Sequence, residues 1–331
     1  MIRPSLPIGF VLLPAPFPVV RLLPFDFPFP PNYLEIDDDD GRSLRMHYLD
    51  EGPSDGPVML LLHGMPTWSY LYRDFIPELT AAGYRCIAPD HLGFGRSDKP
   101  IDIHWYTIAR HTEVLTTLIT SLDLQDITLV CQDWGGPTGL AQAAAMPDRF
   151  SRLVIMNTWL HHEGYEYSEG IRRWNANWHD EGLFAREKPN VALLLLMSAG
   201  LLPRDKFIEG LVSGVEPEMS EEAKKMYDGY FAPIKGLPDE AYNGYRRFPL
   251  SIPLDSYDNG NAAAQEMHYR NLLDWNKKVD FIWGIADDVF TEEWGKEWSQ
   301  RMKGTFYPIS GAGHFLQNTH AKEVVKHILE G

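Results

Sequence analysis

Residues 127–136 read ITLVCQDWGG, and this stretch decides the fold. Its first half is short and largely apolar, which indicates a strand buried on both faces of a sheet. Glycines follow where a helix should begin, so the chain can turn sharply from strand to helix. This strand–turn–helix pattern is the layout of a nucleophile elbow, and Asp133 stands at its apex, where hydrolases usually carry serine.

An aspartate at this apex favours one kind of chemistry. Its carboxylate is an anion near neutral pH, so no base is needed to activate it. Such a nucleophile suits displacement at carbon better than attack on a peptide or an ester. Asp133 could instead cap the following helix, but the glycines of the turn favour the nucleophile.

Outside the elbow, short apolar runs alternate with segments of helical periodicity. The expected strands are residues 45–48, 58–62, 84–88, 127–132, 153–157, 280–283 and 305–309. The expected helices are residues 68–82, 105–122, 135–146, 292–302 and 321–329. This alternation predicts an α/β fold with a mostly parallel central sheet flanked by helices.

The alternation stops in the third quarter of the chain, which is rich in Trp, Tyr, Pro and Glu and has no convincing strand. An inserted group of helices explains this break, and at the end of the sheet where the elbow lies it would form a cap. We therefore expect a core of residues 30–159 and 271–331, a helical cap of residues 160–270 and a Pro-rich extension of residues 1–29.

Two later strand ends carry the partners that an elbow nucleophile needs. In this fold the chain order is nucleophile, acid, histidine. Residues 284–287 read GIAD after a strand and offer Asp287 as the acid, with the adjacent Asp288 as the alternative. Residues 311–315 read GAGHF and offer His314 as the base. All three side chains are predicted at the carboxyl ends of parallel strands, where open α/β sheets build their sites.

Two backbone amides are expected to stabilise a developing oxyanion. One belongs to the residue after the nucleophile, Trp134. The other follows the strand of residues 58–62, where the sequence HGMP nominates Met65. Only the backbone N–H is required, so the methionine side chain is free to line a pocket.

The composition narrows the class of protein. The chain has 331 residues and a formal net charge of −16, which argues against nucleic acid or an anionic membrane as a partner.

Cys86 and Cys131 lie in apolar runs and are expected to be buried thiols, and no zinc-binding pattern occurs. Prolines interrupt the apolar N-terminus, so no membrane helix is expected there. We expect a cytoplasmic protein, with the periplasm as the alternative.

With these residues assembled, the sequence resembles the haloalkane dehalogenases of the α/β-hydrolase superfamily, in the subfamily whose acid follows the later strand. The matching stretches are PPNYL (30–34), HYLDEG (47–52), HGMPTWSYLYR (63–73), GFGRSDKP (93–100), QDWGG (132–136) and GHF (313–315). The resemblance covers residue 30 to the end. Residues 1–29 and Met65 depart from the family pattern.

The resemblance implies a halide site made of two indole N–H donors. One is Trp134, and the other lies early in the cap, where the sequence SEGIRRW nominates Trp174, with Trp178 as the rival. It also implies a reaction: Asp133 displaces halide to form an alkyl ester, and His314, oriented by Asp287, activates the water that hydrolyses it. No metal or organic cofactor is implied. The implied partners are a small apolar halogenated substrate and halide, with the protein a monomer or small homo-oligomer.

Two other functions are alternatives to haloalkane dehalogenation. An epoxide hydrolase shares the triad but needs acidic groups on the oxirane oxygen, and the candidate side chains are Tyr165, Tyr167, Tyr227, Tyr230, Tyr242 and Tyr245. A non-catalytic receptor of this fold would have no need of nucleophile, acid, base and oxyanion strand together. The sequence contains no Gly-x-Ser-x-Gly motif, which argues against a serine esterase.

Overall fold

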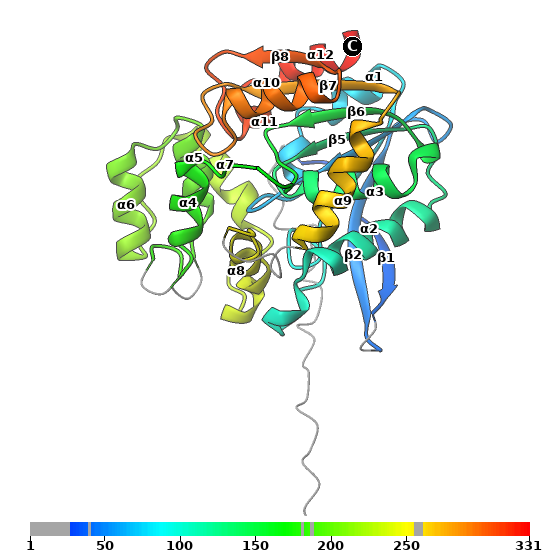
Figure 1. The fold of residues 1–331 in the computed structure, drawn as a ribbon. Coiled ribbons are helices and arrows are strands. Elements are labelled where there is room, and N and C mark those ends of the chain that lie inside the picture. Colours follow the sequence, from blue (N-terminus) through cyan, green and yellow to red (C-terminus); the bar gives the residue numbers. More distant parts are fainter. Residues whose placement is uncertain (1–26, 39–40, 180–181, 186–188, 255–260) are drawn as a thin grey trace, which may run out of the picture.

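The computed structural model describes residues 27–38, 41–179, 182–185, 189–254 and 261–331. Its centre is an eight-stranded sheet with the strand order β1-β2-β4-β3-β5-β6-β7-β8 (Figure 1). The strands β1 and β2 are antiparallel, as are β2 and β4, and the remaining pairs are parallel. The strands are Asn32–Asp37, Ser43–Glu51, Val58–Leu62, Arg85–Pro89, Ile127–Gln132, Phe150–Met156, Lys278–Gly284 and Thr305–Ile309, numbered β1 to β8 in chain order. The predicted mostly parallel sheet is confirmed.

The two central strands are the most deeply buried. Every residue of β3 and of β5 is buried, as expected for parallel strands covered by helices on both faces. Their register pairs Leu62 with Cys131, so the loop after β3 begins beside the end of β5. This register brings His63–Met65 next to the elbow residue Asp133.

Helices flank the sheet on both faces (Figure 1). The helices α2, α3 and α9 pack in a row, and α1 packs against α12. The flanking helices are α1 (Ile76–Ala81), α2 (Ile108–Ser121), α3 (Gly135–Ala145), α9 (Ala262–Leu273), α10 (Glu292–Arg301), α11 (Leu316–Thr319) and α12 (Ala321–Glu330). Among the described residues, no helix is long and apolar enough to cross a membrane.

A group of five helices lies beside the sheet, between β6 and α9 in the chain (Figure 1). They are α4 (Glu169–Ala176), α5 (Ala192–Ser198), α6 (Arg204–Ser213), α7 (Glu221–Phe231) and α8 (Asn243–Leu250). The next helix, α9, packs against α3 although most of it, residues 262–270, falls within the predicted cap of residues 160–270. The division into core and cap stays a prediction, and residues 1–26 of the predicted extension lie outside the described residues.

One predicted helix is wrong. Residues 68–82 form a 3-10 turn at Ser69–Tyr72 and then the short helix α1. Pro77 lies in the first turn of α1, where its missing N–H costs no hydrogen bond, so a new helix begins there. The strand β1 was not among the predicted strands; it lies at the edge of the sheet and pairs antiparallel with β2.

Candidate active site

The backbone at Asp133 is held in a strained conformation. Its φ of 51° lies in the left-handed region, which non-glycine residues seldom adopt. The amide of Asp133 donates to the carbonyl of Asn157 at 3.0 Å and thereby ties the turn to the end of β6. Steric crowding requires glycine at two positions near this turn. A Cβ on Gly64 would overlap the Asp133 side chain, and a Cβ on Gly135 would overlap the carbonyl of Leu62.

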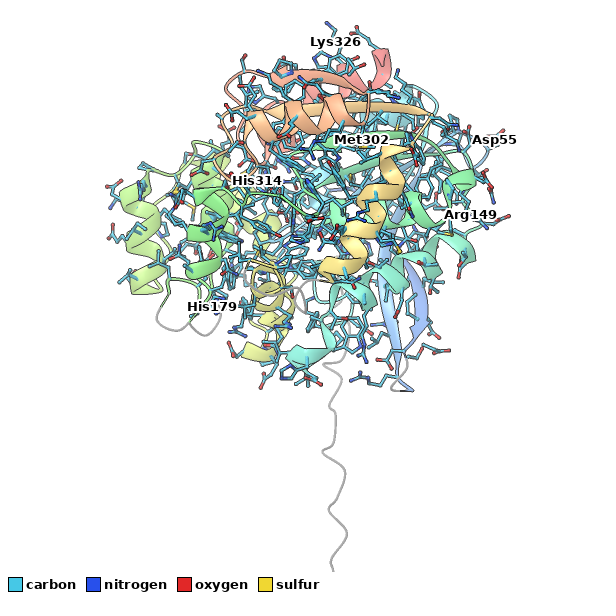
Figure 2. The ribbon with its side chains drawn as sticks, viewed as in Figure 1. Asp55, Arg149, His179, Met302, His314 and Lys326 are labelled. Carbon is cyan, nitrogen blue, oxygen red and sulfur yellow. The ribbon has the colours of Figure 1, made fainter. Side chains whose placement is uncertain are left out.

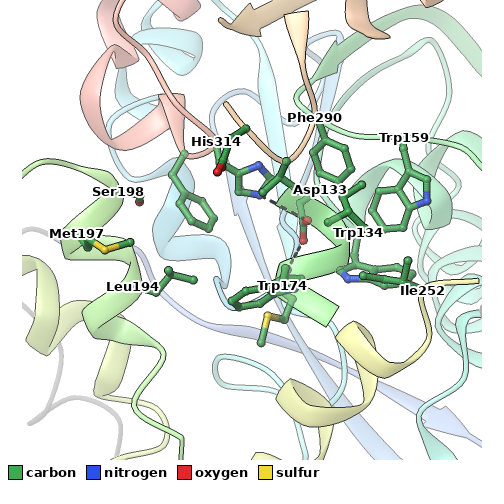
Figure 3. Close-up of a pocket in the computed structure, with 15 residues that line it drawn as sticks. Asp133, Trp134, Trp159, Trp174, Leu194, Met197, Ser198, Ile252, Phe290 and His314 are labelled. Atoms are coloured by element: carbon green, nitrogen blue, oxygen red, sulfur yellow. Dashed lines mark hydrogen bonds and ion pairs between the residues drawn. The ribbon is translucent and has the colours of Figure 1, made fainter. Parts of the chain in front are cut away.

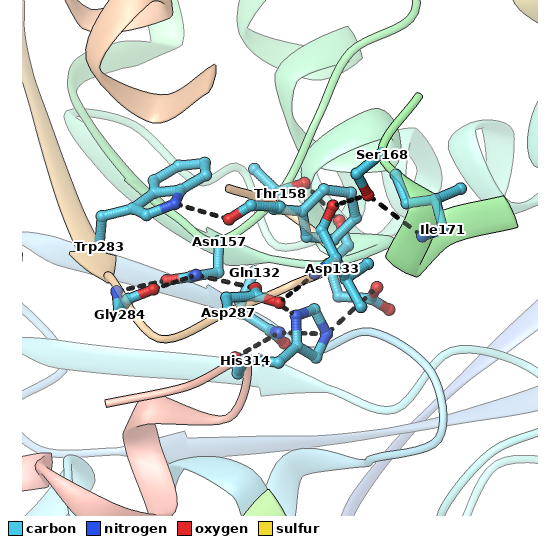
Figure 4. Close-up of polar contacts among 12 residues, drawn as sticks. Gln132, Asp133, Asn157, Thr158, Ser168, Ile171, Trp283, Gly284, Asp287 and His314 are labelled. Carbon is cyan, nitrogen blue, oxygen red and sulfur yellow. Dashed lines mark hydrogen bonds and ion pairs between the residues drawn. The ribbon is translucent and has the colours of Figure 1, made fainter. Parts of the chain in front are cut away.

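His314 lies between two carboxylates. Its Nδ1 is 2.9 Å from Oδ2 of Asp287, and its Nε2 is 3.5 Å from Oδ2 of Asp133 (Figure 3, Figure 4). In Figure 2 it lies toward the middle of the view, whereas Asp55 and Lys326 are at the periphery. The structure thus brings together the three side chains that the strand-end pattern nominated. The alternative acid, Asp288, is exposed and pairs instead with Arg173.

Asp287 is itself held from two sides. Its Oδ1 accepts a hydrogen bond from the amide of Val289 at 2.8 Å. Its Oδ2, the atom that faces His314, also accepts from Nδ2 of Asn157 at 2.9 Å. The Oδ1 of Asn157 accepts from the amide of Gly284 at 2.7 Å, so both ends of this buried amide are bonded (Figure 4). This supporting role of Asn157 was not predicted from the sequence.

Gln132 is a second contact that sequence reasoning missed. Its Nε2 lies 3.0 Å from Nε2 of His314 and donates to the carbonyl of His314 at 3.1 Å. The side chain is fully buried although glutamine seldom is, and a polar residue ending a buried strand was the available signal.

The electrostatics of His314 favour its charged form. Burial opposes protonation, but the charge of Asp287 and the hydrogen bond and charge of Asp133 outweigh it and raise the pKa of His314 to about 10. While both carboxylates are ionised, His314 is therefore a cation at neutral pH. Neutralising Asp133 would remove one of these causes and lower the pKa.

One of the two predicted oxyanion amides contacts the Asp133 side chain directly. The amide of Met65 donates to Oδ1 of Asp133 at 2.7 Å. Trp134 is the N-cap residue of α3, where backbone N–H groups have no partner within the helix. Both amides therefore belong to segments that flank the Asp133 carboxylate.

An apolar cavity of about 150 Å³ opens over Asp133 and His314 (Figure 3). Its other lining residues are Met65, Trp134, Trp159, Ile171, Trp174, Leu194, Met197, Ser198, Ile252, Asp288, Val289, Phe290 and Phe315. Both predicted halide-binding indoles, Trp134 and Trp174, are in this lining. The rival Trp178 is not: it is buried and stacks on Phe184, with ring centroids 5.0 Å apart.

No tyrosine is among the described residues that line this cavity. Three of the candidates for an epoxide-opening acid bond elsewhere: Tyr167 to His161, Tyr227 to Asn190 and Tyr230 to Asn318. The described lining of the cavity is therefore mostly apolar, includes three tryptophans and contains no phenol.

Comparison with known proteins places the chain among characterised relatives. Residues 57–321 match the family model described as alpha/beta hydrolase fold. A haloalkane dehalogenase of Psychrobacter cryohalolentis is 38% identical over 315 residues, which cover 92% of this chain and 93% of the relative. One of Mycolicibacterium paratuberculosis is 37% identical over 311 residues, covering 92% and 93%. The solved structure of the tetrameric haloalkane dehalogenase DpaA from Paraglaciecola agarilytica NO2 superimposes with a TM-score of 0.80 at 35% identity, covering 98% of this chain and 99% of that one.

Proposed function

Since the chain belongs to the haloalkane dehalogenases, hydrolases of the alpha/beta hydrolase fold, we propose that Asp133, His314 and Asp287 carry its hydrolytic dehalogenation. The observation that carries this assignment is the line of contacts from Asp287 through His314 to Asp133, which ends in an apolar cavity between two indoles.

The first step forms an ester on Asp133. Oδ2 attacks the carbon that bears the halogen, the new C–O bond forms as the carbon–halogen bond breaks, and halide leaves with the bonding electron pair. Oδ1 remains as the ester carbonyl oxygen. It already accepts the amide of Met65 at 2.7 Å, so the attacking oxygen is Oδ2, the one that faces His314.

The departing halide is held by the indole N–H groups of Trp134 and Trp174, which both line the cavity. These donors are neutral, so they stabilise the charge that develops on the halogen without binding the product as tightly as a cation would. Trp134 and Trp159 pack edge to face with ring centroids 4.6 Å apart, and this contact supports the Trp134 ring.

The second step hydrolyses the ester. His314 takes a proton from water as the water oxygen attacks the ester carbonyl carbon, and Asp287 stabilises the resulting imidazolium. The negative charge develops on Oδ1, against the amides of Met65 and Trp134. As this intermediate collapses, the C–O bond to the alkyl group's oxygen breaks, and the leaving oxygen takes a proton from the His314 imidazolium, so that the alcohol departs. The new Asp133 carboxyl group gives up its proton and becomes a carboxylate again, and the net products besides the alcohol are halide and a proton.

The reaction itself prepares His314 for its role. Before alkylation, Asp133 helps to hold the pKa of His314 at about 10, so the ring is protonated and cannot act as a base. Ester formation removes the negative charge of Asp133, which lowers this pKa and frees Nε2 for the water. The base thus becomes available when the ester that it must hydrolyse has formed.

We propose a monomer or a small homo-oligomer in the cytoplasm; a relative is described as tetrameric, and size-exclusion chromatography with light scattering would measure the state of this chain.

Product analysis tests the function. The enzyme is expected to release bromide and 1-butanol from 1-bromobutane in equal amounts and to leave styrene oxide unchanged. Diol formation from styrene oxide without bromide release would instead identify an epoxide hydrolase.

A further inference from the structure

The loop of residues 287–290 serves both the triad and the halide site. Asp287 orients His314, while Val289 and Phe290 line the cavity. The same loop is the surface on which α4, the helix that carries Trp174, is docked. The position of the second indole therefore depends on contacts with the loop that bears the catalytic acid.

The docking begins at the first turn of α4. Ser168 is the N-cap residue, and its Oγ accepts the amide of Ile171 at 3.1 Å. The same hydroxyl donates to the carbonyl of Val289 at 2.6 Å (Figure 4). One side chain thus fixes both the start of the helix and its distance from the loop.

Two further residues of α4 meet Asp288. Gly170 is buried, and a Cβ at this position would overlap the carbonyl group of Asp288, so only glycine permits this approach. One turn further on, the guanidinium of Arg173 pairs with the Asp288 carboxylate. This ion pair is exposed and adds little to global stability, so its value would lie in holding the helix end beside Trp174.

We propose that Ser168, Gly170 and Arg173 are positioning residues of the halide site, which set the place of the Trp174 indole by docking α4 on the loop of residues 287–290. This inference rests on the proposed roles of the two indoles. A hydrogen bond from an indole weakens steeply with distance and angle, so a displacement of about 1 Å is enough to lose most of its contribution.

The effect should fall on halide binding and not on ester hydrolysis. Asp287 has a second support in Asn157, which directly follows β6 and does not depend on α4. Loosening α4 would therefore move Trp174 while the acid and His314 keep their contacts. A general loss of structure would impair both steps, which makes the two explanations separable.

The test combines two measurements. Bromide binding is titrated by the quenching of tryptophan fluorescence, and the reaction steps are measured by single-turnover kinetics on 1-bromobutane. Gly170→Ala is expected to raise the bromide Kd about fivefold or more, and Ser168→Ala and Arg173→Gln about two- to fivefold. The rate of ester hydrolysis should stay within about threefold of wild type. Ser168→Thr, which keeps the hydroxyl, and Arg172→Gln, which changes the exposed neighbouring arginine, should bind bromide as wild type does.

Thermal unfolding identifies the variants that are folded. If Gly170→Ala does not fold, the two single variants Ser168→Ala and Arg173→Gln are sufficient for the test. Wild-type bromide affinity in every folded docking variant, alongside lost affinity in Trp174→Phe, would overturn the inference and leave the proposed function standing. A wild-type enzyme that neither binds bromide nor releases it from 1-bromobutane would overturn the proposed function itself.

Discussion

The amide of Met65 donates to Oδ1 of Asp133 at 2.7 Å. In the proposed mechanism, the oxygen that becomes the ester carbonyl therefore already lies against the amide that later stabilises the oxyanion. Because no rearrangement is needed between the two steps, the nucleophile and the hydrolytic site form one preorganised unit. This relationship also explains the glycine at position 64, where a Cβ would displace the carboxylate.

Replacing the nucleophile should abolish the first step. Asp133→Asn keeps the shape of the side chain but removes the anionic oxygen, so kcat/KM for 1-bromobutane should fall about 10⁴-fold or more. Asp55→Asn, at an exposed site, is the matched control and should retain wild-type activity. Bromide release is the measurement, and substantial activity in Asp133→Asn would exclude Asp133 as the nucleophile.

The same substitution should change the titration of His314. Removing the Asp133 charge should lower the pKa of His314 from about 10 by about one unit or more, as followed by NMR of the imidazole. In wild type the folded pKa is above the ordinary value of 6.5, so the stability that it contributes is present below pH 6.5 and is lost as pH rises toward about 10. Asp133→Asn should lose stability over a narrower window that ends at lower pH. An unchanged His314 titration would contradict the proposed coupling.

Asn157 should matter mainly for hydrolysis. Asn157→Ala removes one hydrogen bond from Asp287 and leaves Gly284 without its partner, so hydrolysis of the alkyl ester should slow about tenfold. Loss of this buried amide should also cost about 1–3 kcal/mol of unfolding free energy. Ester formation, measured by single-turnover kinetics, should change little, and Asn271→Ala at the surface of α9 is the control. Equal slowing of ester formation and ester hydrolysis would contradict the prediction that Asn157 acts mainly in hydrolysis.

The two cap tryptophans should differ in halide binding. Trp174 lines the cavity, whereas Trp178 packs outside its lining. Trp174→Phe should therefore weaken bromide binding about tenfold or more, and Trp178→Phe should stay within about twofold of wild type. The reverse order would assign the second indole to Trp178.

The residues at the strand ends could be predicted from the sequence, but the contacts between loops could not. Apolar runs located β5, β7 and β8, and the rule that sites gather at carboxyl strand ends nominated Asp133, Asp287 and His314. Nothing in periodicity relates Ser168 to Val289, because their contact joins an inserted helix to a loop far along the chain. The roles of Gln132 and Asn157 were hidden for the same reason: a buried amide has meaning only once its partners are known.

The most direct test of the central claim is the mass of His314→Phe after reaction with 1-bromobutane. Without its base the variant should form the ester and fail to hydrolyse it. Intact-mass spectrometry should then show one added butyl group, released bromide should equal one per active site, and peptide mapping should locate the adduct on Asp133. Multiple turnovers without an adduct, or an adduct on another residue, would contradict the account.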